Sequence, residues 1–208
     1  MAKNVVEFIG TFFLVFTIGM VVLDPGVPAG FAPIAIGTVL AVMIFAGGHV
    51  SGGHFNPAVT LGVFLRDKKF GMNDAIGYWV AQIVGGLVAA LAVIFLKGGG
   101  GGGMSVEVVP ALLAEFIFTF ALVYVVLNVA TAKGTSGNSF YGWAIGSTVL
   151  VGAYAVGGIS GGAFNPAVAI GASLMGALSW GNIWIYLVAN LAAGAAAAYA
   201  FKYTHPGE

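Results

Sequence analysis

Two asparagines, Asn56 and Asn165, are the residues whose type and spacing most clearly predict a chemical role in this chain. Each is the second residue of the pentapeptide Phe-Asn-Pro-Ala-Val, which occupies positions 55–59 and again positions 164–168. Asparagine is a strong N-cap and proline is favoured at the first helical position, so each copy predicts the start of a helix. A capping asparagine uses its side-chain oxygen on its own helix, which leaves its NH₂ group facing outwards as a donor.

The composition indicates that these donors lie in a membrane. The chain has 208 residues, of which 60% are hydrophobic and 7% charged, with a mean hydropathy of +1.02. About six helical spans of roughly 20 residues fit in this length. Zero net charge gives no indication of a nucleic-acid partner, and the absence of cysteine excludes disulfides and thiol chemistry. The first apolar run carries Glu7 and has no small-residue cleavage site, so we expect a membrane span and not a signal peptide.

Six long apolar segments and two short ones predict the helices that position the asparagines. The expected spans are at about 4–23, 31–49, 73–96, 107–130, 139–156 and 180–202. The segments at about 56–65 and 165–175 would each give about 15 Å of helix, half of a hydrocarbon core of about 30 Å. The predicted fold class is therefore an all-α membrane protein with six transmembrane helices and two re-entrant half-helices.

The basic residues predict the orientation of the chain. Six spans put both termini on one side of the bilayer, and a cytoplasmic amino terminus places all basic residues except Lys97 inside. The inner set is Lys3, Arg66, Lys68, Lys69, Lys133 and Lys202. This distribution follows the positive-inside rule, so we expect cytoplasmic termini and a multi-pass protein of the cell or plasma membrane.

The two halves of the chain repeat one another well beyond the asparagines. Glu7-Phe8-Ile9-Gly10-Thr11-Phe12 matches Glu115-Phe116-Ile117-Phe118-Thr119-Phe120, and Ala35-Ile36-Gly37 matches Ala144-Ile145-Gly146. A unit of three spans enters the membrane inverted the second time, so one half-helix is expected from each face. We therefore predict a single channel domain, 1–208, made of inverted repeats 1–97 and 104–208. The glycines at 98–103 join them as a flexible linker of no fixed shape, to which we assign no chemistry.

The glycine-rich stretch before each asparagine predicts irregular backbone along a pore. Each stretch carries four glycines within seven residues, which is too many to continue a helix comfortably. Irregular backbone at membrane depth is tolerated where it is buried in protein or lines water. The pore-lining backbone is expected at Gly52, Gly53, His54, Gly161 and Ala163.

The chemistry of such a pore follows from its donors. Two half-helix N-termini, each carrying about +0.5 of an elementary charge, would meet at mid-membrane and repel cations. A water between Asn56 and Asn165 accepts a hydrogen bond from both, so its own hydrogens point away and a proton wire is interrupted. The constriction would comprise Asn56, Pro57, Ala58, Asn165, Pro166 and Ala167. An isolated Asn-Pro-Ala usually means only a helix start, but two matched copies favour the pore.

With these features the chain resembles the aquaporin and aquaglyceroporin, or major intrinsic protein, family over nearly its whole length. The resemblance rests on the paired Asn-Pro-Ala boxes, the segment 51–60, and Glu7 and Glu115 in the first and fourth spans. It implies the hourglass fold, a homotetramer in the lipid bilayer with one pore per subunit, and passive transport of water or small uncharged solutes.

The resemblance fails at one informative position. Most of the family has arginine directly after the second Asn-Pro-Ala, whereas this chain has Val168. Transferring the remaining filter positions by their distance from the asparagines gives Ile36, Ala153 and Gly162. All four are apolar or small, so we expect a wide filter that passes water and also glycerol, urea, ammonia, hydrogen peroxide or undissociated metalloid hydroxides. The alternative is that Tyr154 or Phe164 swings inward and narrows the pore.

Four titratable residues, Glu7, Glu115, His49 and His54, have more than one possible role. A charge inside a span is costly, so Glu7 and Glu115 require partners. A proton relay is one reading, but their symmetry and the resemblance favour structural support of the two irregular loops. His49 could line a cytoplasmic vestibule and respond to pH, because histidine is the side chain that changes charge near neutrality. His49 and His54 lack further ligands to complete a metal shell, and no cofactor is expected.

Three rival functions remain open from the sequence. Inverted repeats also occur in secondary transporters, which saturate and can accumulate substrate. A non-conducting membrane junction protein would keep the fold and show no solute flux. An enzyme is the weakest rival, because the residues assemble no nucleophile, metal shell or cofactor loop.

Overall fold

A computed structural model describes residues 1–24, 26–28, 30–67 and 69–208. Within them, six helices are long and apolar enough to cross a membrane. These are α1 (Ala2–Val22), α2 (Ala32–Ser51), α4 (Met72–Lys97), α5 (Val108–Val126), α6 (Tyr141–Ser160) and α8 (Ile183–Thr204). A π-helical turn, η1 (Leu127–Thr131), extends α5, and two 3₁₀ turns follow, η2 (Lys133–Thr135) and η3 (Trp180–Asn182).

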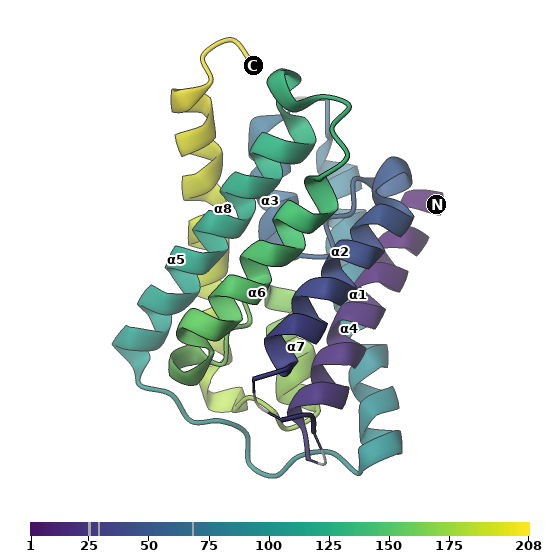
Figure 1. Ribbon diagram of the computed structural model, residues 1–208, viewed down its shortest axis with the longest axis vertical. Helices are drawn as coiled ribbons and strands as arrows, with labels where there is room; N and C mark the ends of the chain where they lie inside the picture. The colour runs from purple at the N-terminus through teal and green to yellow at the C-terminus, as the bar shows by residue number, and fades with distance from the viewer. Residues whose placement is uncertain (25, 29, 68) are drawn as a thin grey trace.

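Two short helices complete the fold, α3 (Pro57–Arg66) and α7 (Pro166–Leu174). They begin directly after Asn56 and Asn165, and the predicted all-α fold of six spans and two half-helices is confirmed. In Figure 1, α3 lies in the half of the molecule that carries both termini, and α7 lies in the opposite half. Lys68, assigned above to the inner side, is outside the described residues.

Matching helices of the two halves make matching contacts. The helix α1 packs on α4 as α5 packs on α8, and α2 crosses α6 between these pairs. The crossing is close at Gly37 and Gly146, where a Cβ on either glycine would lie within 2.7 Å of the other's carbonyl oxygen. The two halves therefore meet at equivalent residues of the sequence repeat.

The half-helices interlock the two halves. The helix α3 packs mainly on α8, and α7 packs mainly on α4, so each half-helix contacts the last helix of the other half. Glycines permit this approach, because a Cβ on Gly194 would lie 2.6 Å from the carbonyl oxygen of Ala58, and one on Gly86 would lie 2.9 Å from that of Ala167. The start of each half-helix is thus held by a glycine of the opposite half.

The glycine-rich stretches are more helical than the sequence predicts. Helix α2 runs through Gly47 and Gly48, and α6 runs through Gly157 and Gly158. The absence of a side chain serves packing in the first case, because a Cβ on Gly47 would lie 2.4 Å from Val6. Within these two stretches, irregular backbone is confined to 52–56 and 161–165, which corrects the prediction that the whole of each glycine-rich stretch is irregular.

The glycine run at 98–103 has a defined path, which corrects the expectation of a shapeless linker. The amide of Gly100 donates to the carbonyl of Met175 (2.8 Å), and that of Met104 donates to Ala177 (2.9 Å). Met104 also forms a parallel β-bridge with Leu178. Gly103 has a φ of 70°, and a Cβ there would lie 2.4 Å from the backbone of Leu178. Glycine is therefore required for this segment to lie against 175–178.

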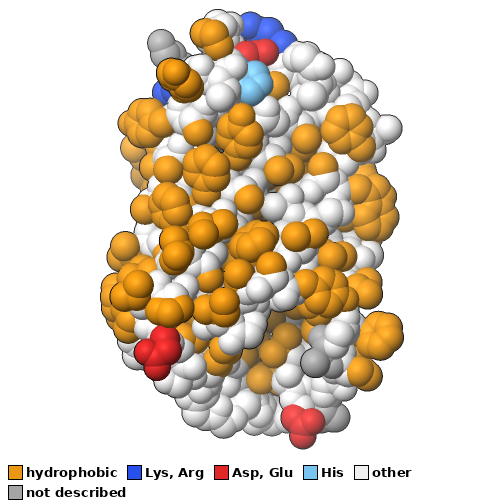
Figure 2. Space-filling view, turned by 60° about the vertical axis from the view of Figure 1, so that its left-hand side comes forward, with side chains coloured by type: hydrophobic (Ala, Val, Ile, Leu, Met, Phe, Trp, Pro, Cys, Tyr) orange, Lys and Arg blue, Asp and Glu red, His pale blue; other side chains and the backbone are white. Residues whose placement is uncertain are grey.

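The outer surface suits a bilayer. Figure 2 shows apolar side chains across the middle of one face and charged side chains at its two ends. Every long helix exposes large apolar side chains, among them Phe13, Val42, Val84, Leu113, Val151 and Val188. Exposed apolar surface of this extent is stable in hydrocarbon and not in water.

Candidate functional site

The first irregular loop is built on the buried carboxylate of Glu7. One carboxylate oxygen, Oε1, accepts from the hydroxyl of Ser51 (2.7 Å) and the amide of His54 (2.9 Å). The other oxygen, Oε2, accepts from the amide of Phe55 (2.6 Å) and the side chain of Gln82 (2.8 Å). Since Glu7 is fully buried, these bonds replace the water that it loses in the membrane interior.

The second loop is built in the same way on Glu115. Its carboxylate accepts from the hydroxyl of Ser160 (2.8 Å) and from the amides of Ala163 (2.9 Å) and Phe164 (2.7 Å). A tyrosine hydroxyl also donates to the last carbonyl of the preceding helix, Tyr186 to Ser160, at 2.6 Å. Both glutamates thus contact the irregular loop of their own half, and all donors to Glu115 named here are local to that half.

Both loops hold a phenylalanine in an unfavourable backbone conformation. Phe55 and Phe164 each have a φ of 48°, in the left-handed region that costs a bulky residue about 1–3 kcal/mol. The Phe55 ring occupies the space left by Gly10, where a Cβ would lie 2.2 Å away, and the Phe164 ring packs near Gly152 in the same manner. The glutamates fix the amides of these phenylalanines, and the strained turn directs each following asparagine to the centre of the molecule.

The asparagines cap the half-helices. The Oδ1 atom of Asn56 accepts from the amide of Ala58 (2.8 Å), and that of Asn165 accepts from the amide of Ala167 (2.9 Å). Pro57 and Pro166 occupy the first helical positions. All of Pro57, Ala58, Pro166 and Ala167 are buried behind the asparagines. The sequence repeat therefore forms two equivalent helix starts at the centre of the fold.

Each asparagine also contacts the opposite loop, which sequence reasoning did not anticipate. The Nδ2 atom of Asn56 donates to the carbonyl of Phe164, and that of Asn165 donates to the carbonyl of Phe55, both at 2.8 Å. Of the two hydrogens on each amide, one is thus used within the protein, which corrects the expectation that the whole NH₂ group faces outwards. The second hydrogen remains for a molecule beside the asparagine.

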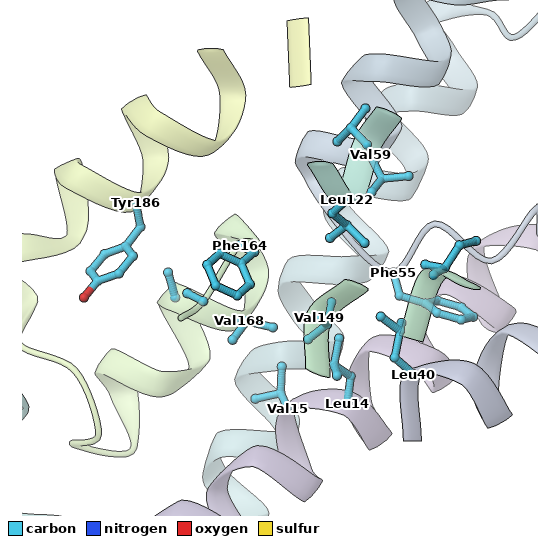
Figure 3. Packing of buried hydrophobic residues seen from close by; sticks show 14 of the residues in the cluster. Leu14, Val15, Leu40, Phe55, Val59, Leu122, Val149, Phe164, Val168 and Tyr186 are labelled. Carbon is cyan, nitrogen blue, oxygen red and sulfur yellow. The ribbon is translucent and has the colours of Figure 1, made fainter. Parts of the chain in front are cut away.

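A cavity of about 450 Å³ extends from these asparagines to Val22 and Val27, at and just after the end of α1. In Figure 1 this end of α1 lies in the half of the molecule opposite the termini. All four predicted filter residues line it, namely Ile36, Ala153, Gly162 and Val168. Gly157 and Gly158 also line it, and a Cβ on either would meet no atom within 4 Å, so their lack of a side chain leaves the cavity open. Figure 3 shows Val168 between Phe164 on one side and Val149 and Leu14 on the other.

The two aromatic residues considered as alternative filters lie outside the cavity. Tyr154 is exposed, and its hydroxyl donates to the carbonyl of Gly30. Phe164 is 1% exposed, and its ring contacts Phe118 with centroids 5.5 Å apart. The cavity instead includes Met104 and Leu178, which the sequence did not single out. The only available signal was that Met104 directly follows the glycine run.

The remaining predicted lining residues divide between two cavities. His54, Gly161 and Ala163 line the first, and the Nδ1 atom of His54 lies 3.1 Å from the hydroxyl of Thr60. A second cavity of about 550 Å³ lies near the other end, with Gly52 and His49 in its wall beside residues 129–133. Gly53 lines neither cavity in the described part of the chain.

No metal centre is formed by the residues that the structure describes. They contain no group of three or more His, Asp or Glu side chains placed to hold an ion, so His49 and His54 gain no further ligand there.

The chain is similar to known proteins over nearly its whole length. The model of the family described as major intrinsic protein matches residues 1–201. Among curated proteins, Aquaporin NIP3-1 of Arabidopsis thaliana is 37% identical and Nodulin-26 of Glycine max is 35% identical, each over 96% of this chain. The chain spans 66% of the length of the first relative and 76% of the second.

One solved structure shares the fold. The aquaglyceroporin from Plasmodium falciparum superposes with a TM-score of 0.80 over 96% of this chain and 94% of that chain, at 21% sequence identity. At this identity the likeness concerns the arrangement of the helices.

Proposed function

This chain belongs to the major intrinsic protein family, and on that premise we propose that it forms a passive pore for water and for neutral solutes larger than water. Members of the family are channels and not enzymes, and a channel for water and small neutral solutes is the activity that the relatives support. The observation that carries the wider selectivity is the wall of the 450 Å³ cavity, whose four filter positions hold Ile36, Ala153, Gly162 and Val168.

The wall favours size over charge as the basis of selection. Among the described residues that line this cavity there is no Asp, Glu, Lys or Arg, and the one imidazole belongs to His54. An apolar wall offers a solute no fixed charge and few hydrogen bonds, so a molecule that fits and carries no charge can enter. Valine at position 168 leaves open the space that the longer side chain of arginine would fill.

The asparagines supply the selection against ions. Asn56 and Asn165 line the inner end of the cavity, each with one amide hydrogen left for a passing molecule. The N-termini of α3 and α7 add a positive field at the same place. A cation is repelled there, and a water held by both donors cannot accept the next proton of a chain of waters. Neutral acceptors such as water, urea and glycerol meet no such barrier.

We further propose the setting of this pore in the membrane. Both termini would be cytoplasmic, which puts the cavity lined by Val168 on the outer side and His49 in an inner vestibule. The repeats 1–97 and 104–208 would act as one channel domain, because the half-helices interlock them. A homotetramer with one pore per subunit follows from the family resemblance and leaves the pore within the monomer.

The proposal is tested with the purified protein in liposomes. Stopped-flow light scattering would measure flux of water, urea, glycerol and erythritol, and a pH-sensitive dye inside the vesicles would measure proton flux, with protein-free liposomes as the control. We expect water, urea and glycerol to move downhill without saturation and protons not to move. Saturating or uphill transport would indicate a carrier, no flux of any solute would indicate a junction protein, and water flux alone would contradict the wide filter.

A further inference from the structure

The segment that follows the glycine run carries a side chain into the outer cavity. Met104 is fixed through its backbone, because its amide donates to Ala177 (2.9 Å) and its carbonyl accepts from Ser179 (3.4 Å). Four residues earlier, Gly100 donates to Met175 (2.8 Å), so the run is attached to 175–179 at both ends. Met104 is therefore held at a defined position over the cavity.

Met104 and Leu178 lie together beside the second loop. Both line the 450 Å³ cavity, and the β-bridge brings their backbones side by side. A Cβ on Gly161 would lie 2.7 Å from Cδ2 of Leu178 and 3.8 Å from Sδ of Met104. Gly161 directly precedes the filter position Gly162, so the two side chains stand next to the filter loop and on the outer side of it.

Met104 and Leu178 are larger than the filter residues beside which they lie. Three of the four filter residues are valine, alanine or glycine, and none of them extends far from its backbone. Methionine fills irregular space well, since its unbranched thioether adapts to its surroundings. The thioether sulfur is a weak hydrogen-bond acceptor and the side chain has no donor, so methionine excludes solutes by size without binding them.

We propose that Met104, together with Leu178, is a specificity-determining residue that sets the largest neutral solute admitted by the pore. This inference rests on the proposed channel function and assigns its size limit to the segment after the glycine run. Removing the Met104 side chain widens the cavity beside the filter loop, so that larger polyols pass more readily while water, which is small enough already, is little affected.

The test compares three methionine variants by flux in proteoliposomes. We expect Met104→Ala to raise the erythritol-to-water flux ratio by roughly tenfold, about the discrimination that an apolar site gains from a methylene-sized difference. Met104→Leu, which keeps the volume, should stay close to wild type. Met43→Ala is the matched control, because Met43 packs against the core on α2 and does not line the cavity.

A backbone variant gives an independent readout. Gly103→Ala would force a Cβ to within 2.4 Å of Leu178, displace Met104 and raise the same ratio. Gly101→Ala is its control, since a Cβ there meets no atom within 4 Å and the φ is not positive. Equal ratios in Met104→Ala and Met43→Ala would overturn the proposal. The fluxes of the wild-type protein test the channel function separately. If wild type passed only water, the wide filter would be contradicted, but Met104→Ala would still be expected to admit larger solutes.

Discussion

The side chain of Asn56 donates a hydrogen bond to the backbone carbonyl of Phe164, so the cap of the first half-helix is fixed to the loop that begins the second. Asn165 contacts Phe55 in return, at the same distance of 2.8 Å. The amide of Phe164 is in turn held by the carboxylate of Glu115. Each asparagine is therefore positioned by a glutamate of the other half, and a disturbance of one loop is transmitted to the asparagine of the opposite half-helix.

Replacing the asparagine amide by a hydroxyl separates its two roles. Serine caps a helix about as well as asparagine does, but Asn56→Ser lacks the Nδ2 donor to Phe164. We expect the free energy of unfolding in mixed detergent micelles to fall by about 1–3 kcal/mol, the cost of leaving a buried acceptor unpaired. Asn56→Ala should lose about 1 kcal/mol more, because it also removes the cap. If Asn56→Ser were as stable as wild type, the cross-loop bond would contribute nothing.

The buried glutamates should be required for stability. In Glu7→Gln an NH₂ group faces donors that now contact a carboxylate, among them the amides of His54 and Phe55. Since hydrogen bonds to charged groups contribute about 1.5–3 kcal/mol each, we expect a loss of about 3 kcal/mol or more in unfolding free energy. Glu115→Gln should behave similarly.

The control for these variants is Glu107→Gln. Glu107 is exposed at the start of α5 and makes no side-chain cap bond there, so its substitution should leave stability within about 0.5 kcal/mol of wild type. A proton relay, in contrast to structural support, would show as lost proton-coupled uptake with the stability of Glu7→Gln unchanged.

The close approach of α8 to α3 should not tolerate one additional carbon atom. In Gly194→Ala the new Cβ would lie 2.6 Å from the carbonyl oxygen of Ala58, at the first turn of the half-helix. We expect destabilisation of about 1–3 kcal/mol, as overpacking of a tight interface causes, together with reduced water flux. Gly134→Ala is the control, because a Cβ on this exposed glycine of η2 meets no atom within 4 Å and the residue lines neither cavity. It should change neither the thermal stability nor the water flux.

Arg66 should stabilise the end of the molecule that carries the termini. Its guanidinium donates to the carbonyl of Thr131 (2.9 Å), lies 3.3 Å from the carboxylate of Glu208 and stacks over Phe201 at 5.2 Å. Because these groups are only partly exposed, we expect Arg66→Met to lower the unfolding free energy by about 1–2 kcal/mol. Substitution of the exposed Lys69 by Met should have little effect, and an equal loss in both variants would argue against these specific contacts.

The elements that carry the site could be predicted from the sequence repeat, because each of them depends on residues that are close in the chain. Asn-Pro starts a helix wherever it occurs, and a buried glutamate requires donors, which the neighbouring loop supplies to Glu7 and Glu115 alike. Helix boundaries were less predictable. Gly47 and Gly158 lie within helices and do not interrupt them. Gly47 allows a neighbouring helix to pack closely, and Gly158 leaves the cavity open.

Contacts between distant segments had no local signal in the sequence. The bond from Asn56 to Phe164 depends on how the inverted halves meet, and the hydrogen bonds of Gly100 depend on the segment 175–179 lying beneath it. A glycine run is compatible with a flexible tether and with a backbone packed too closely for side chains. The close approach of Leu178 to Gly103 and of Gly176 to Gly100 distinguishes these two possibilities.

The glycerol-to-water flux ratio of wild type and Val168→Arg, measured in parallel proteoliposome preparations, shows whether an apolar filter lets solutes larger than water through. Val168 lines the 450 Å³ cavity together with Ile36 and Gly162, so an arginine side chain there would narrow the cavity and add a charge. If the wide apolar filter admits these solutes, the arginine variant loses erythritol and glycerol flux first and keeps part of its water flux. A fall of all solutes and water by one common factor, or a wild type that passes no glycerol, would contradict it.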